Sequence, residues 1–371
     1  MQEEKLYLDN KLETQQYKCP NCGGTSVFSP TEQKLKCEYC GTVFDIPNQT
    51  SVSEHELEEL LKGAKNWTEA QVVKCASCGG KQIVNNNEIS LICSFCGATN
   101  IVETNELPGI TPHGVVPFKI ERDNTINFIK KWAKNKFFAP SSFKNSIEPK
   151  NIHGVYAPVF TFDAKTQTSY SGSLYNTYTT THTDSQGRTH TRTHKKNFRI
   201  SGNHKHSFDD LVINASISSN VYDKNINDKF LYNLQPFPTN TAKTYNTQYL
   251  TGFSALTYSK DGKQCWQEGI NVMENQIRRS ILNGYSYDGI NYYSQNTKIL
   301  SSSYKFVLVP IYIGHYYFKE KTYYFYVNGH SGKVYGKTPL SPIKITLFVL
   351  FIITIIVLFA ILFSVIGSKI E

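Results

Sequence analysis

Eight of the nine cysteines stand in pairs separated by two residues, a spacing typical of metal sites. The first set is Cys19, Cys22, Cys37 and Cys40, and the second set is Cys75, Cys78, Cys93 and Cys96. In each set 14 residues separate the two pairs, and the sets repeat at an offset of 56 residues. Two thiolates on one tight turn can take two corners of a tetrahedron about 2.3 Å from Zn²⁺. The sequence therefore predicts two structural Zn²⁺ ions, each bound by four cysteines.

The residues around these pairs predict the elements that position them. Glycine follows each pair, as at Gly23 and Gly41, where a positive φ lets the turn close around the sulfurs. The residues between the pairs predict a short hairpin, with strands at 27–28 and 34–36 in the first set. We therefore expect two zinc ribbons, at 1–50 and 72–104, joined by a helical spacer at 51–71 that opens on a capping box at 53–56. Disulfide-linked loops and iron–sulfur ligation are the alternatives to zinc.

A run of 22 uncharged residues, Ile345–Ile366, predicts a transmembrane helix. At 1.5 Å per residue it spans about 33 Å, which matches a hydrocarbon core of about 30 Å. Lys333, Lys337 and Lys344 precede the run and Lys369 follows it, and the opening Met-Gln-Glu-Glu-Lys does not resemble a signal peptide. The positive-inside rule then places residues 1–344 in the cytosol, anchored to the cytoplasmic membrane by a single C-terminal pass.

Between ribbons and anchor, a turn-rich linker at 105–115 precedes an α+β domain at 116–340 that is dominated by antiparallel sheet. Segments 155–162 and 307–313 are predicted strands, and each contains a proline, which favours a sheet edge or a bulge there. Residues 322–335 predict a hairpin around an Asn-Gly turn. Apolar residues at helical spacing predict one helix that begins at Asp123 and a second that ends at Asn283-Gly284.

Three features of this domain allow two interpretations each. The helix from Asp123 carries Lys130, Lys131, Lys134 and Lys136, which favour a solvated face on a packed helix or, alternatively, contact with anionic lipid. The histidine-rich segment 178–206 is predicted to form a polar hairpin around an Asp-Ser-Gln-Gly turn, with a metal site as the alternative. Cys265 is predicted to be a buried thiol, with a nucleophile as the alternative. Phosphate loops, nucleophile elbows and paired carboxylates in a usable context are missing, so we do not expect an enzyme.

Charge separates the chain into two parts. Residues 1–104 hold 9 Lys/Arg and 14 Asp/Glu, a net of −5, whereas residues 105–371 hold 30 and 16, a net of +14. Two zinc ions with four thiolates each would make the first part still more negative. Since nucleic-acid affinity depends on neutralising phosphates with Lys and Arg, the acidic ribbons are expected to bind protein partners and not nucleic acid.

The order of cysteine pairs, aromatic β domain and C-terminal span resembles a bacterial family of transcription-factor-IIB-type zinc-ribbon membrane proteins. Besides the cysteines, the resemblance rests on segments 156–163, 208–211, 249–253 and 327–334. Members often bear names borrowed from primosomal helicases, although no helicase motor is visible here. Some members look like partners of flotillin-like and phage-shock-type proteins. This implies a scaffold that recruits soluble proteins to the membrane, and the resemblance extends this expectation to a membrane-stress response.

Two functions therefore stay open. The first is a non-enzymatic membrane scaffold whose ribbons bind protein. The second is a membrane-tethered nucleic-acid binder that uses the basic domain at 105–340. The sequence names neither the partner nor the oligomeric state.

Overall fold

The computed structural model describes residues 17–47, 50–62, 70–76, 81–85, 101–103, 110–145, 152–216, 229–256, 260–319 and 321–367. The strands are β1 (Ser26–Ser29), β2 (Lys34–Cys37), β3 (Val43–Phe44), β4 (His55–Glu56), β5 (Ala70–Cys75), β6 (Lys81–Asn85), β7 (Ile101–Glu103), β8 (Gly114–Val115), β9 (Ile152–Thr183), β10 (Thr189–Asn214), β11 (Lys243–Thr244), β12 (Ser254–Leu256), β13 (Gly289–Phe318), β14 (Lys321–Asn328) and β15 (Val334–Gly336). The helices are α1 (Leu57–Lys62), α2 (Arg122–Lys134), α3 (Ser141–Asn145), α4 (Lys229–Leu234), α5 (Gly262–Leu282) and α6 (Pro342–Gly367), with the 3₁₀ turns η2 (Thr239–Thr241) and η3 (Thr247–Leu250). The expected α+β class with antiparallel sheets is confirmed.

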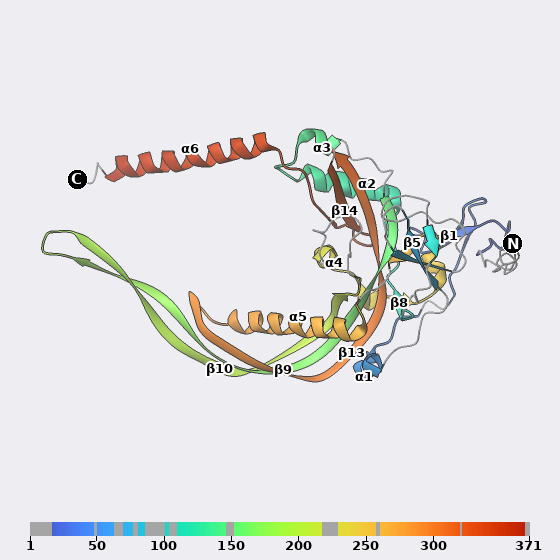
Figure 1. Cartoon of the computed structure of the whole chain (residues 1–371), viewed down its shortest axis with the longest axis horizontal. Coiled ribbons are helices and arrows are strands. Elements are labelled where there is room, and N and C mark those ends of the chain that lie inside the picture. Colours follow the sequence, from blue (N-terminus) through green and yellow to red (C-terminus); the bar gives the residue numbers. More distant parts are fainter. Residues whose placement is uncertain are drawn as a thin grey trace, which may run out of the picture.

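Strands β9, β10 and β13 form a long, bent antiparallel sheet, called the ribbon below and distinct from the predicted zinc ribbons (Figure 1). Strand β9 is its centre, because it pairs with β13 on one side, from Gly289↔Tyr175 to Gly314↔Ile152, and with β10 on the other. The turn between β9 and β10 is held by Asp184, whose Oδ1 accepts hydrogen bonds from the backbone N–H groups of Gln186 and Arg188, both at 2.9 Å. The predicted polar hairpin is confirmed, and it is part of a longer one than the sequence indicated.

The two proline-containing segments are central strands rather than edges. Residues 155–162 of β9 and 307–313 of β13 pair with each other, and apolar side chains cover both faces, which explains their unbroken apolar runs. At Pro158 the outer neighbour of β9 changes from β10 to β12, and at Pro310 the outer neighbour of β13 changes from β8 to β14. A missing N–H is tolerated there because each proline lies at a gap between neighbours.

Helix α5 lies in the concave side of the ribbon (Figure 1). Its N-cap Asp261 accepts a hydrogen bond from the Gln264 N–H at 2.8 Å and completes a capping box, which fixes the start of the helix at Gly262. Trp266 packs on Phe162 with ring centroids 5.1 Å apart. A Cβ at Gly269 would lie 3.3 Å from the Phe162 ring, so glycine permits this close approach. The predicted end of the helix at Asn283 is confirmed.

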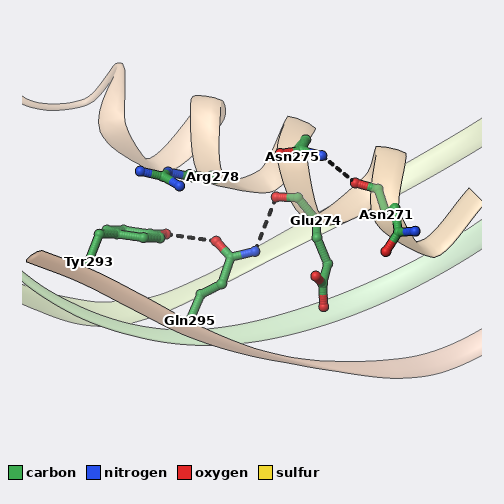
Figure 2. A pocket seen from close by; sticks show the side chains of 6 residues that line it. All are labelled: Asn271, Glu274, Asn275, Arg278, Tyr293 and Gln295. Carbon is green, nitrogen blue, oxygen red and sulfur yellow. Dashed lines mark hydrogen bonds between the residues drawn. The ribbon is translucent and has the colours of Figure 1, made fainter. Parts of the chain in front are cut away.

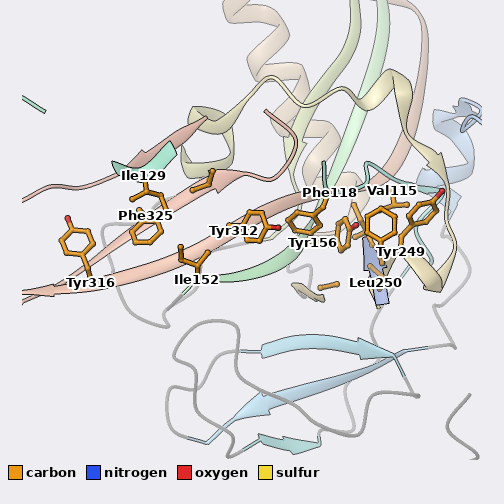
Figure 3. Close-up of a cluster of buried hydrophobic side chains, with 14 of the residues drawn as sticks. Val115, Phe118, Ile129, Ile152, Tyr156, Tyr249, Leu250, Tyr312, Tyr316 and Phe325 are labelled. Atoms are coloured by element: carbon orange, nitrogen blue, oxygen red, sulfur yellow. The ribbon is translucent and has the colours of Figure 1, made fainter. Parts of the chain in front are cut away.

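Apart from the apolar side chains around α5, a separate core cluster runs along the half of β9 and β13 that α5 does not cover (Figure 3). Ile129 of α2 and Phe143 of α3 cover the sheet there, against Phe325 and Tyr316. Asp123 lies in the first turn of α2 and does not cap it; the N-cap is Glu121, whose side chain makes no capping bond. The carboxylate of Asp123 still favours the helix from this position, through the helix dipole.

The residues before α1 adopt a different structure from the predicted capping box. His55 and Glu56 form β4, which pairs with Ser303 and Tyr304 of β13, and the helix starts only at Leu57. Pairing with a central strand takes precedence over a local cap. Leu57 and Leu60 of this short helix are buried in the same cluster as α5.

Candidate metal centre

The first four cysteines converge on one point. Strands β1, β2 and β3 form a small antiparallel sheet; Cys19 and Cys22 precede it, Cys37 is the last residue of β2, and Cys40 lies between β2 and β3. One sulfur atom from each lies within 4.8 Å of the others. The Sγ atoms of Cys19 and Cys40 are 3.5 Å apart, as are those of Cys22 and Cys37.

This geometry fits a tetrahedral ion. With Zn–S bonds of about 2.3 Å, the edges of a regular tetrahedron measure about 3.8 Å, close to these separations. Each pair lies on a turn closed by glycine: the Gly23 N–H donates to the Cys19 carbonyl at 2.9 Å and the Gly41 N–H to the Cys37 carbonyl at 3.1 Å. Their φ values are 72° and 74°, a region that disfavours side chains. The two glycines are therefore needed to close both turns.

The pKa values of these thiols, together with their close spacing, favour the binding of a cation. A hydrogen bond from the Thr42 hydroxyl lowers the pKa of Cys40 to about 6, and a hydrogen bond from the Cys40 N–H lowers the pKa of Cys37. The pKa of Cys22 is raised to about 12, because the lowering effect of a hydrogen bond from Gly24 is outweighed by the thiols of Cys40 and Cys37. Four sulfurs this close can all be thiolates only around a positive ion. The cluster can therefore hold one metal ion in a closed, structural site.

The second cysteine set is described only at Cys75, which is buried at the end of β5 and pairs in register with Ile101 of β7. Cys78, Cys93 and Cys96 lie outside the described residues. A second metal site consequently stays a prediction from the spacing alone.

A cluster of three carboxylates, Glu54, Asp163 and Asp210, is the other arrangement that could hold a cation among the described residues. The side chain of Lys305 already occupies this position. Its Nζ lies 2.6 Å from Glu54 and 2.7 Å from Asp210, and only 7% of the side chain is exposed. The lysine supplies the positive charge, so the cluster is an internal ion-pair network.

The electrostatics of this network agree with that assignment. Burial lowers the pKa of Lys305, but hydrogen bonds and charge from Asp210 and Glu54 outweigh it, and the net pKa is raised. Burial raises the pKa of Asp163, whose Oδ1 accepts the Asp210 N–H at 2.7 Å. Asp210 has φ 50° at a bulge in β10. The sequence did not predict the network, because its members are separated by long stretches of chain and only the sheet register brings them together.

The alternative sites in the middle domain gain no support. In the histidine-rich hairpin, His190 contacts Asp184 at 3.2 Å and His194 contacts the Thr180 hydroxyl at 2.8 Å. No group of three metal-ligating side chains forms in the described part of this hairpin. Cys265 is fully buried, with Sγ 3.9 Å from the carbonyl oxygens of Asn214 and Lys260, so a substrate cannot reach it.

A polar hollow of about 310 Å³ lies between α5 and β13 (Figure 2). Tyr293 donates to the Gln295 side chain at 2.9 Å, and Gln295 in turn donates to the Glu274 carbonyl at 3.1 Å. The Arg278 guanidinium lies over the Tyr293 ring, 5.2 Å from its centroid. These side chains fasten α5 to the sheet and present no nucleophile, so the hollow reads as a packing feature.

Comparison with known proteins adds one relative. The chain is 26% identical over 335 residues to the uncharacterized protein YdjG of Bacillus subtilis (strain 168), and the match covers 89% of this chain and 91% of that protein. No family model matches the chain, and no solved structure matches it. The match extends over nearly all of both proteins, but the name of this relative states no activity.

The metal centre can be tested on the full-length protein purified in detergent. Replacing Cys22→Ser together with Cys40→Ser should lower the metal content, measured by elemental mass spectrometry, by one ion per chain, because a structural site does not hold the ion with two ligands. Cys265→Ala is the control and should leave the content unchanged. An unaltered content in the double variant would show that these cysteines bind no metal.

Replacing Lys305→Met should lower the free energy of unfolding by about 1–3 kcal/mol, because the partly buried carboxylates of Asp163 and Asp210 lose their counter-ion. Burial already raises the pKa of Asp163, and removing the Lys305 charge raises it further, so the loss should be largest at neutral pH and shrink as pH falls and this carboxyl protonates. Urea unfolding of the full chain at several pH values measures this. Lys298→Met, at an exposed position of the same strand, should change little; equal effects of the two substitutions would contradict the network.

Proposed function

We propose that this chain is a non-enzymatic membrane scaffold: α6 anchors it in the cytoplasmic membrane, and two N-terminal zinc ribbons recruit cytosolic proteins. The observation that carries the proposal is the placement of a four-cysteine module that can hold a metal ion and of an apolar helix on one continuous body. Helix α6 is long and apolar enough to cross a membrane, and its apolar stretch within 342–361 is not buried against the body. The module around Cys19–Cys40 lies at the opposite end of the body from the free end of α6 (Figure 1).

The module is fastened to the body by specific contacts. Phe28 of β1 packs edge-on against Tyr249, with ring centroids 5.4 Å apart, and its N–H donates to the Thr251 carbonyl at 3.3 Å. The Gln33 side chain donates to the Phe118 carbonyl at 2.6 Å. A partner bound to the module would therefore be held in a fixed position relative to the anchor, which is what a scaffold requires.

The exposed part of the module suits a protein partner. Tyr39 lies between Cys37 and Cys40 and is 78% exposed, and exposed aromatic residues are enriched at the energetic centres of protein interfaces. A zinc ion with four thiolates adds a charge of −2 beside it, which disfavours phosphate. The sequence resemblance suggests flotillin-like or phage-shock-type proteins as the partner class.

One observation favours the second function, nucleic-acid binding. The convex face of the ribbon, which points away from α5, carries Lys165 on β9, Arg199 and Lys205 on β10, and Lys298 on β13. Lys205 and Lys298 both lie beside Gln167, one on each side, because the register pairs them with it. Cations on one face of a sheet could contact successive phosphates.

Recruitment can be tested by affinity purification of the full-length protein from detergent-solubilised membranes. Tyr39→Ala should lose the soluble proteins that co-purify with the wild type, because the substitution removes the exposed aromatic side chain at the proposed interface. Tyr232→Ala removes a tyrosine that is 64% exposed elsewhere and should retain them. Equal retention by both variants would exclude the module as the docking surface.

A salt titration separates the two functions. The scaffold proposal expects no binding of duplex or single-stranded DNA to the protein in neutral-lipid nanodiscs, even at low salt, where electrostatic attraction is strongest. Micromolar binding that weakens steeply with salt, and that is lost on replacing Arg199 and Lys205 with Gln, would instead establish the nucleic-acid function.

Orientation is tested by cysteine labelling of intact cells. Lys369→Cys should react with a membrane-impermeant thiol reagent, and Lys5→Cys should not react above the wild-type background, because the lysine bias retains residues 1–344 in the cytosol. The opposite labelling pattern would reverse the proposed topology.

A further inference from the structure

The connection between α2 and α3 is attached to the first turns of α6. Phe348 of α6 packs against Phe138 and Phe137, with ring centroids 5.3 and 6.2 Å away. The Ser341 N–H donates to the Phe138 carbonyl at 2.8 Å, and the Lys344 Nζ donates to the Ala139 carbonyl at 2.7 Å. Wherever α6 enters a bilayer, the end of α2 must therefore lie beside the entry point.

The apolar residues at this joint are exposed. Phe137 is 65% exposed, and so are Leu340 and Ile343, at 63% and 72%. Phe348, which Phe137 contacts, lies four residues after Lys344, about 6 Å further along the helix axis. With the uncharged run in hydrocarbon, Phe137 reaches the boundary between headgroups and acyl chains, where apolar side chains are stabilised.

Positive charge surrounds these apolar residues. Lys130, Lys131, Lys134 and Lys136 are exposed, while Ile129 and Ala133 on the opposite face of α2 are buried against the sheet. The sequence from Asn124 to Ile147 contains five lysines and no Asp or Glu. Basic clusters next to a membrane span attract anionic lipid electrostatically.

We propose that Lys130, Lys131, Lys134, Lys136 and Phe137, here called the α2 platform, bind anionic phospholipid headgroups of the bilayer that α6 spans. The proposal rests on the proposed membrane span. Lipid is favoured over an acidic protein or a nucleic acid because the contact of Phe137 with Phe348 fixes the platform at the membrane surface.

The platform also bears on the tilt of the molecule. The β9–β10 hairpin points to the same side of the body as α6 (Figure 1). Its exposed residues include Lys195, Lys196 and Arg188, which cannot enter hydrocarbon at acceptable cost. The bilayer must therefore meet the body at an angle that leaves this hairpin in water, and headgroup contacts on the α2 platform help to set that angle.

The test uses the full chain with Phe137→Trp in nanodiscs that mix phosphatidylcholine and phosphatidylglycerol. Either lipid is brominated on its acyl chains, at equal total bromine, and the Phe137→Trp difference fluorescence is read against the parent protein. Enrichment of phosphatidylglycerol at the platform should make quenching by the brominated anionic lipid about twofold or more greater than by the brominated neutral lipid, and salt should reduce this ratio.

Two charge variants decide the outcome. Replacing Lys130, Lys131, Lys134 and Lys136 with Gln should bring the ratio to one, whereas replacing Lys165, Lys195, Arg199 and Lys205 with Gln removes the same charge from the ribbon and should leave it unchanged. Failure of the parent protein to enter nanodiscs would overturn the membrane span and the platform together. Incorporation with a ratio of one, no quenching by either lipid, or equal effects of the two variants would overturn the platform alone.

Discussion

The antiparallel pairing of β9 with β13 is the interaction on which the rest of the structure depends. The pair continues from Ile152 to Tyr175 in one strand and from Gly289 to Gly314 in the other. Its two faces are covered by elements from all parts of the described chain, including α1, α2, α4 and α5. Side chains that alternate along each strand serve different clusters, so a shift of one residue would exchange these faces and remove every cluster at once.

The same pairing positions two further features, the ion-pair network of Lys305 and the cysteine module. It places Lys305 of β13 against Asp210 at the bulge of β10, and Glu54 just before β4 completes the network. It also supports the surface on which Phe28 of the cysteine module docks. A change in these strands would therefore reach the four-cysteine cluster through the packing around Phe28.

A scaffold needs rigid placement of its binding surfaces more than it needs a cavity. The described part of this chain has that character: its polar hollow between α5 and β13 is crossed by hydrogen bonds, its carboxylate cluster contains its own lysine, and its cysteine centre leaves no open coordination position. Exposed surfaces of the described part include Tyr39 on the module, the basic convex face of the ribbon and the α2 platform.

The sequence by itself determined the features that depend on neighbouring residues. The spacing of Cys19–Cys40 specified the thiol cluster, the uncharged run specified α6, the Asp-Ser-Gln-Gly turn specified the hairpin, and the apolar spacing specified α5. Each of these needs only contacts within one turn, one helix, or one hairpin such as the one that joins the two cysteine pairs. Tertiary structure alone decided that the proline-containing strands are central, that His55 and Glu56 pair with β13 instead of capping a helix, and that Lys305 meets Asp210. These outcomes depend on register between segments far apart in the chain, where packing energy outweighs local preference and leaves no local signal in the sequence.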